Sequence, residues 1–148
     1  MTRDTAAYRI VSMEKKDKQS YRHKAGSVSL IRYHFVWTPR RRRRVLIGTI
    51  AERLDDLIRA KAIELDLEIL AFAIQPDHIH LFVIADPDIA PSLIAGRLKG
   101  YTSRVLRSEF KELLKLPSLW TTAYFVSTAG NVSSETIAGY IQAQSTRA

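Results

Sequence analysis

Two apolar runs joined by a proline turn constrain the fold of this chain most. Leu67–Ile74 and Ile79–Ala85 are rich in branched and aromatic residues and have the length of strands. Pro76-Asp77 between them favours a turn, so the two strands should pair antiparallel. Both runs are apolar on both faces over part of their length, which predicts that helices cover one side of the sheet.

Further strand and helix signals surround this hairpin. Val28–Trp37 and Trp120–Thr128 have the composition of a first and a last strand. Apolar residues at helical spacing predict a helix from Thr49 to about Asp66, and Pro91 suits the start of a second, which reaches about Arg107. Ser133 would cap a final helix that ends near Thr146.

The order of these elements predicts an α+β fold of the ferredoxin-like (RRM-like) split β-α-β type, with an antiparallel sheet, helices on one face and an additional C-terminal helix.

Length and residue types exclude several classes of protein. The chain has 148 residues, the size of one domain. It contains no cysteine, which excludes a disulfide framework, a cysteine nucleophile and a cysteine-ligated zinc site. No apolar stretch approaches the roughly 18–20 residues of a membrane span, and the N-terminus lacks the apolar segment of a signal peptide. We therefore expect a cytoplasmic protein that does not cross a membrane.

The net charge of +8 is concentrated in the first third of the chain. Residues 1–27 carry seven basic and three acidic side chains, and residues 28–47 carry six arginines, five of them consecutive at Arg40–Arg44, and no acid. We expect residues 1–27 to form a flexible basic extension, in which Tyr8 to Val11 could pair as an edge strand, and residues 28–148 to form the single domain. The charge indicates either a polyanion partner or a solvated tail, and the arginine run favours nucleic acid.

Two histidines two positions apart begin the second apolar run. Alternate side chains of a strand share a face, so His78 and His80 would lie side by side, roughly 7 Å apart at the backbone, and could grip one metal ion. A metal beside a basic surface suggests phosphate chemistry on a nucleic acid, although spacing alone also allows a surface accident. Asp77 could orient one histidine, but forming the turn is its simpler role. We interpret His34 as a structural residue or a DNA contact, not as a ligand.

The predicted final helix presents a second pair of polar residues. Tyr140 and Gln144 lie one turn apart, on the same face as Ile137 and Ile141. On spacing alone, a packing tyrosine and a glutamine at the rim of an amphipathic helix are the better interpretation.

A His-hydrophobic-His strand followed far downstream by a Tyr-x-x-x-Gln helix resembles the active-site pattern of the single-tyrosine HUH transposases encoded by small bacterial and archaeal insertion sequences. The resemblance extends from about residue 28 to residue 145, and its combined motifs are highly specific. The similar segments are a first strand and basic turn (residues 33–40), the metal strand (75–82), part of the second helix (98–100), and the last strand and turn (119–120, 124–126 and 130–133).

The resemblance implies a DNA transposase that cleaves and rejoins single-stranded DNA at the ends of its insertion sequence through a covalent 5′-phosphotyrosine. Tyr140 would be the nucleophile, and His78, His80 and Gln144 would bind a divalent metal, Mg²⁺ or Mn²⁺. A catalytically inactive or domesticated relative that binds hairpin DNA or RNA without cutting is the alternative. All four site residues are intact, which argues against it.

The same resemblance implies the partners. The family recognises single-stranded DNA with short imperfect hairpins at the element's ends, and it is dimeric, so we expect a homodimer whose active site can be completed in trans by the partner's tyrosine helix. DNA contacts would come from the basic turn and from the second helix. The residues concerned are Arg40, Arg41, Arg42, Arg43, Arg44, Arg97, Lys99 and Arg104.

Overall fold

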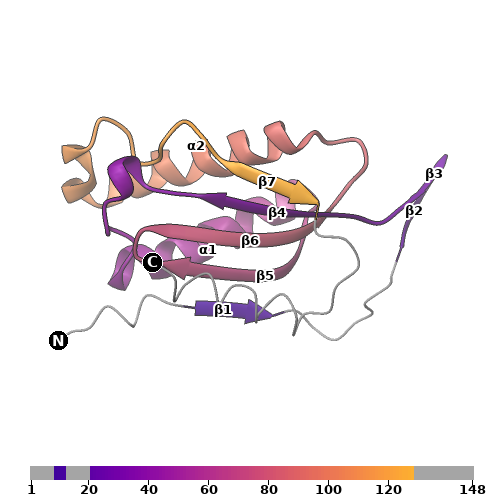
Figure 1. Ribbon diagram of the computed structural model, residues 1–148, viewed down its shortest axis with the longest axis horizontal. Helices are drawn as coiled ribbons and strands as arrows, with labels where there is room; N and C mark the ends of the chain where they lie inside the picture. The colour runs from indigo at the N-terminus through magenta and orange to yellow at the C-terminus, as the bar shows by residue number, and fades with distance from the viewer. Residues whose placement is uncertain (1–8, 13–20, 129–148) are drawn as a thin grey trace.

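A computed structural model of the protein describes residues 9–12 and 21–128. Its centre is a five-stranded antiparallel sheet in the order β1-β5-β6-β4-β7 (Figure 1). The strands of this sheet are β1 (Arg9–Ser12), β4 (Ile31–Trp37), β5 (Glu68–Gln75), β6 (His78–Ala85) and β7 (Phe125–Thr128). The remaining elements are the strands β2 (Arg22–Lys24) and β3 (Ser27–Ser29), the helices α1 (Gly48–Glu64) and α2 (Pro91–Glu109), and the short 3₁₀ helices η2 (Arg40–Arg42) and η3 (Lys111–Lys115).

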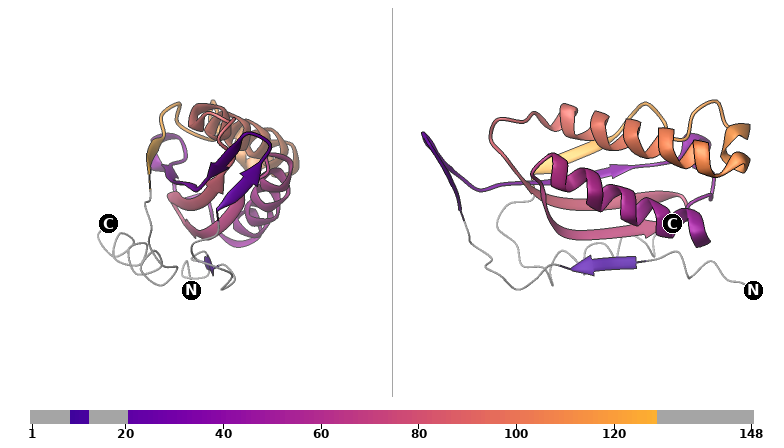
Figure 2. Two further views of the ribbon diagram at one scale, coloured as in Figure 1. Left: turned by 90° about the vertical axis from the view of Figure 1, so that its right-hand side faces the viewer. Right: turned by 180° about the vertical axis from the view of Figure 1, so that it is seen from behind.

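The succession β4-α1-β5-β6-α2-β7 confirms the predicted α+β class with its split β-α-β arrangement. Both helices lie on one face of the sheet, as the view from behind in Figure 2 shows. The predicted C-terminal helix with Tyr140 and Gln144 lies outside the described residues. Among the residues that are described, no helix combines the length and the apolar character needed to span a bilayer.

The β5–β6 hairpin positions the candidate site. Gln75 pairs with His78 across the tight turn, so β6 begins at the first histidine. Ile79, Leu81 and Val83 belong to the core that α1 and α2 cover. Because side chains alternate along a strand, the histidines and Phe82 point to the opposite face.

The N-terminal segment contains more strand than the sequence predicts. Strand β1 pairs with β5 at the sheet edge, which confirms the edge strand expected near Tyr8 to Val11. Strands β2 and β3 form a separate hairpin, so the predicted first strand, Val28–Trp37, in fact begins at Ile31. Residues 1–27, predicted to be a flexible extension, therefore contain β1, β2 and the first residue of β3.

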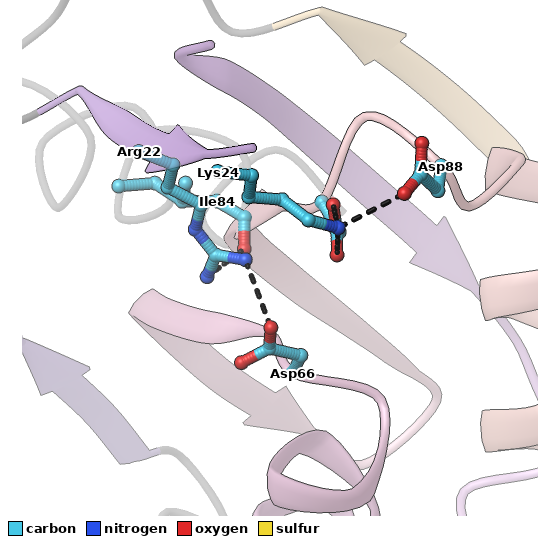
Figure 3. Close-up of polar contacts among 6 residues, drawn as sticks. Arg22, Lys24, Asp66, Ile84 and Asp88 are labelled. Atoms are coloured by element: carbon cyan, nitrogen blue, oxygen red, sulfur yellow. Dashed lines mark hydrogen bonds and ion pairs between the residues drawn. The ribbon is translucent and has the colours of Figure 1, made fainter. Parts of the chain in front are cut away.

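Salt bridges hold the β2–β3 hairpin to the loops at one end of the sheet (Figure 3). The ammonium of Lys24 lies 2.9 Å from Asp86 and 2.9 Å from Asp88. Arg22 donates to the carbonyl oxygen of Ile84 at 3.4 Å and lies 3.6 Å from Asp66. The hairpin is thus anchored near its first strand and projects away from the sheet (Figure 1).

The predicted last strand, Trp120–Thr128, is wrong at its start. Trp120 makes one isolated bridge with Pro39, and β7 begins only at Phe125. Between these two points, the carbonyl oxygens of Thr121 and Ala123 accept hydrogen bonds from the ammonium of Lys99, at 2.7 and 3.1 Å. A side chain of α2 therefore replaces strand pairing in this segment.

Candidate metal centre and nucleic-acid surface

His78 and His80 lie next to each other on β6, on the face of the sheet opposite α1 and α2. Their ring centroids are 5.0 Å apart and the rings are nearly perpendicular, at 80°. His80 is buried, whereas His78 is partly accessible. This is the side-by-side arrangement that their spacing in the sequence predicts.

Asp77 orients the first histidine. Its Oδ1 lies 2.8 Å from Nδ1 of His78, and its Oδ2 accepts a hydrogen bond from Nη2 of Arg42 at 3.0 Å. Burial raises the pKa of Asp77, but the hydrogen bond with His78 and the charges of His78 and Arg42 outweigh it, so the net shift is downward. An ionised carboxylate only accepts hydrogen bonds, so Nδ1 of His78 carries a proton and donates it. In a neutral ring this leaves the lone pair on Nε2.

A third histidine contacts the second. Nε2 of His34 on β4 lies 3.1 Å from Nδ1 of His80, and the two rings are stacked at 5.3 Å between centroids. Burial lowers the pKa of His34 to about 4 and that of His80 to about 3, where the neighbouring histidines add to the effect. Both rings are therefore neutral near pH 7, and a neutral imidazole is the form that binds a metal.

His78 and His80 can bind a divalent cation whose coordination shell is completed by other ligands. In residues 9–12 and 21–128, no group of three or more histidine, cysteine or carboxylate side chains is arranged to hold a metal ion. His78 and His80 supply two imidazoles, and the positions that two nitrogen ligands leave open suit oxygen donors such as an amide or a phosphate. Gln144, the expected third ligand, lies outside the described residues.

The arginine run lies beside this pair of histidines. It follows β4 as the turn η2, where Arg41 and Arg42 adopt left-handed backbone angles with φ of 58° and 52°. Arg40 is tied to Ser118 by a 3.2 Å hydrogen bond, and residues 41–44 are exposed. Through Arg42 and Asp77, this exposed cationic turn is directly connected to His78.

The basic residues of α2 lie elsewhere. Arg97 and Arg104 are exposed on this helix, which covers the face of the sheet away from the histidines. Lys99 uses its ammonium on backbone carbonyls, and burial lowers its pKa. The structure thus brings the arginine turn, but not the α2 residues, to the histidines, and a DNA contact by α2 stays a prediction.

Sequence reasoning missed the contact between His34 and His80. It depends on the register of β4 against β6, in which Val36 lies opposite His80 and His34 opposite Phe82. His34 and His80 are therefore diagonal neighbours on one face. The only signal in the sequence is that a histidine occupies a strand predicted for the same sheet.

Comparison with known proteins defines the class. The family described as "Transposase IS200 like" matches residues 27–144. The chain belongs to this family of IS200-like transposases, and it is therefore an enzyme of DNA transposition that cuts and joins DNA.

Individual relatives agree with this assignment. The chain is 31% identical over 140 residues to the ISDra2 transposase TnpA of Deinococcus radiodurans, covering 93% of this chain and 96% of the relative. It is 28% identical over 116 residues to the transposase for insertion sequence element IS200 of Salmonella typhimurium, covering 76% of each.

Two solved structures share the fold. A crystal structure of a putative transposase from Deinococcus radiodurans aligns with a TM-score of 0.69 and 31% identity, over 83% of this chain and 97% of that one. A REP-associated tyrosine transposase bound to a REP hairpin aligns with a TM-score of 0.51 and 19% identity, over 74% and 61%.

Proposed function

We propose that this transposase cleaves and rejoins single-stranded DNA at the ends of its insertion sequence, through a covalent 5′-phosphotyrosine at Tyr140 and with Mg²⁺ or Mn²⁺ held by His78, His80 and Gln144. The observation that carries the proposal is the pair of imidazoles on β6, 5.0 Å apart and beside an exposed arginine turn. Membership of the IS200-like family supports the reaction class.

In the proposed reaction, the metal ligands and Tyr140 have separate roles. When bound, the divalent ion would supply Lewis-acid stabilisation of charge on the scissile phosphate. The phenol oxygen of Tyr140 would form a bond to phosphorus and lose its proton. The bond from phosphorus to the 3′ oxygen would break, and that oxygen would leave as a 3′-hydroxyl. Attack by a hydroxyl on the phosphotyrosine reverses these steps, so strands are rejoined without a nucleotide cofactor.

The arginine turn would hold the substrate. Exposed guanidinium groups at residues 41–44 attract phosphates. Arg42 contacts Asp77, which in turn contacts His78, so a phosphate bound at Arg42 would bring the DNA backbone to the metal. The structural neighbour whose DNA is a REP hairpin supports hairpin DNA as the recognised form. The chain would act on this DNA as a homodimer.

Single-stranded oligonucleotides that span the end of the element, labelled at either the 3′ or the 5′ end, test the reaction in the presence of Mn²⁺. The 3′ label should remain on the protein in a denaturing gel, and the 5′ label should appear on a released shorter strand. Tyr140→Phe and chelation of the metal should abolish the adduct. Tyr21→Phe, at a tyrosine that is 56% exposed just before β2, should not.

Two outcomes would contradict the proposal. An adduct that Tyr140→Phe still forms would remove this tyrosine from its role. Hairpin binding without cleavage, under every metal tested, would instead favour the inactive binding module.

A further inference from the structure

His34 is a buried histidine whose ring both packs against aromatic side chains and contacts His80. It is only 4% exposed, so in this conformation its ring is not accessible to a DNA strand. Its ring lies flat against Phe82, 4.0 Å between centroids and 5° between planes, with Phe125 edge-on at 5.8 Å. An aromatic hydrocarbon would fill this space equally well, yet the ring directs a nitrogen at His80.

The hydrogen bond between the two rings has one proton and two possible arrangements. If Nε2 of His34 donates, then Nδ1 of His80 accepts, and the proton of a neutral His80 is on Nε2, which then cannot bind a metal. If Nδ1 of His80 donates, then Nε2 of His34 accepts, and Nε2 of His80 keeps its lone pair. Only the second arrangement is compatible with His80 as a ligand.

We propose that His34 is a positioning residue for His80, whose Nε2 atom accepts the Nδ1 proton of His80 and so presents Nε2 of His80 to the divalent cation. The proposal rests on the metal site of the proposed function. It parallels the role of Asp77, which accepts the Nδ1 proton of His78 at 2.8 Å. Both histidines of β6 then face the metal through Nε2, each with its ring held by an acceptor behind it.

The position of His34 suits this role because it is set by the sheet. β4 and β6 are paired along seven consecutive positions, from Ile31 opposite Ala85 to Trp37 opposite Ile79. The stack on Phe82 fixes the plane of the His34 ring. A neutral acceptor on a rigid strand can orient a ligand without placing a second negative charge beside the phosphate of the substrate.

Two substitutions separate the hydrogen bond from the packing. His34→Phe keeps a flat ring against Phe82 and removes both nitrogens. His34→Gln loses the ring but can place an amide oxygen near the position of Nε2, which restores an acceptor. His23→Phe, at an exposed position of β2, is the matched control for the loss of a histidine.

Long-range ¹H–¹⁵N NMR of the metal-free protein reports the tautomer of His80, and a Mn²⁺ titration followed by electron paramagnetic resonance reports affinity. We expect the Nδ1–H tautomer in the wild type and its loss in His34→Phe, with Mn²⁺ bound about 10–100-fold more weakly. His34→Gln should restore most of the Nδ1–H tautomer of His80 and most of the Mn²⁺ affinity. His23→Phe should match the wild type in both.

The two proposals fail in different ways. An Nε2–H tautomer of His80 in the wild type, or wild-type Mn²⁺ affinity in His34→Phe, overturns the role of His34 and leaves the metal site standing. A wild-type protein that binds no Mn²⁺ overturns the metal site itself, and with it the metal-dependent reaction and the role of His34.

Discussion

The two histidines of β6 are held by partners of different chemistry. A charged carboxylate that is also tied to Arg42 holds His78, and a neutral imidazole holds His80. The first contact is between neighbours in the chain, whereas the second joins residues 46 positions apart. The local partner, Asp77, could be proposed from sequence. The distant partner depends on strand register, which no local pattern specifies.

Loss of the charge on Asp77 should weaken metal binding. Asp77→Asn keeps the size of the turn residue but offers Nδ1 of His78 only a neutral acceptor and leaves Arg42 without its carboxylate. We expect Mn²⁺ affinity to fall about 10-fold in a calorimetric titration. Asp88→Asn, at an exposed carboxylate that contacts Lys24, is the control and should bind as the wild type does. Equal affinities of Asp77→Asn and the wild type would contradict the orienting role.

Acid should destabilise the metal-free protein through its buried histidines. His34 and His80 have folded-state pKa values of about 4 and 3, below the usual value of 6.5, because burial disfavours their charged forms. The unfolded chain therefore binds more protons below about pH 6.5, and the stability lost grows as pH falls toward 4 and then 3. Thermal unfolding in the presence of EDTA should show this decline. His34→Phe should make the loss of stability with falling pH shallower. If the loss is equally steep in this variant, burial of His34 does not contribute to it.

At the scale of elements, apolar spacing and proline placement predicted more than strand composition did. The helices observed at Gly48–Glu64 and Pro91–Glu109 begin within one residue of the predicted Thr49 and Pro91. The content of β-branched and aromatic residues predicted a strand that begins at Trp120, which is wrong. Trp120 instead turns into the core and packs edge-on against Trp37, with 6.0 Å between the ring centroids. Burial of a large ring outweighed the strand preference of its neighbours.

The contact between Trp120 and α2 should be measurable as stability. Nε1 of Trp120 donates to Oγ1 of Thr102 at 3.0 Å, and that hydroxyl donates to the carbonyl oxygen of Leu98 at 2.8 Å. Thr102→Val leaves the indole N–H buried without its acceptor and should lower the free energy of unfolding by about 1–3 kcal/mol in denaturant titrations. Thr102→Ser retains the hydroxyl and should lose less. Equal stability of the two variants would show that the hydroxyl contributes nothing here.

At the scale of the whole molecule, the sheet separates two basic surfaces. The arginine turn is linked to His78 through Asp77. The exposed arginines of α2 belong to the helical layer, which lies on one face of the sheet (Figure 2). The sequence predicted that both would bind DNA, because it shows charge but not which face carries it. Tyr140 and Gln144 lie outside the described residues, so their approach to the histidines stays a prediction.

Mixing two inactive variants tests whether the tyrosine acts in trans. Tyr140→Phe keeps its histidines and His80→Ala keeps its tyrosine, so a mixed dimer contains one complete site only if each site combines residues of both subunits. We expect the mixture to form the DNA adduct, located on the His80→Ala chain, which a size tag can identify. No adduct after verified subunit exchange, or a protein that is monomeric by light scattering, would contradict this arrangement.

We propose that His78 and His80 bind one divalent ion through their Nε2 atoms. Pulsed electron paramagnetic resonance of Mn²⁺ bound to protein with ¹⁵N-labelled histidine measures this directly. Couplings to two histidine nitrogens in the wild type, and to one in His80→Ala, are the predicted result. A Mn²⁺ signal without any histidine coupling in the wild type would contradict the account.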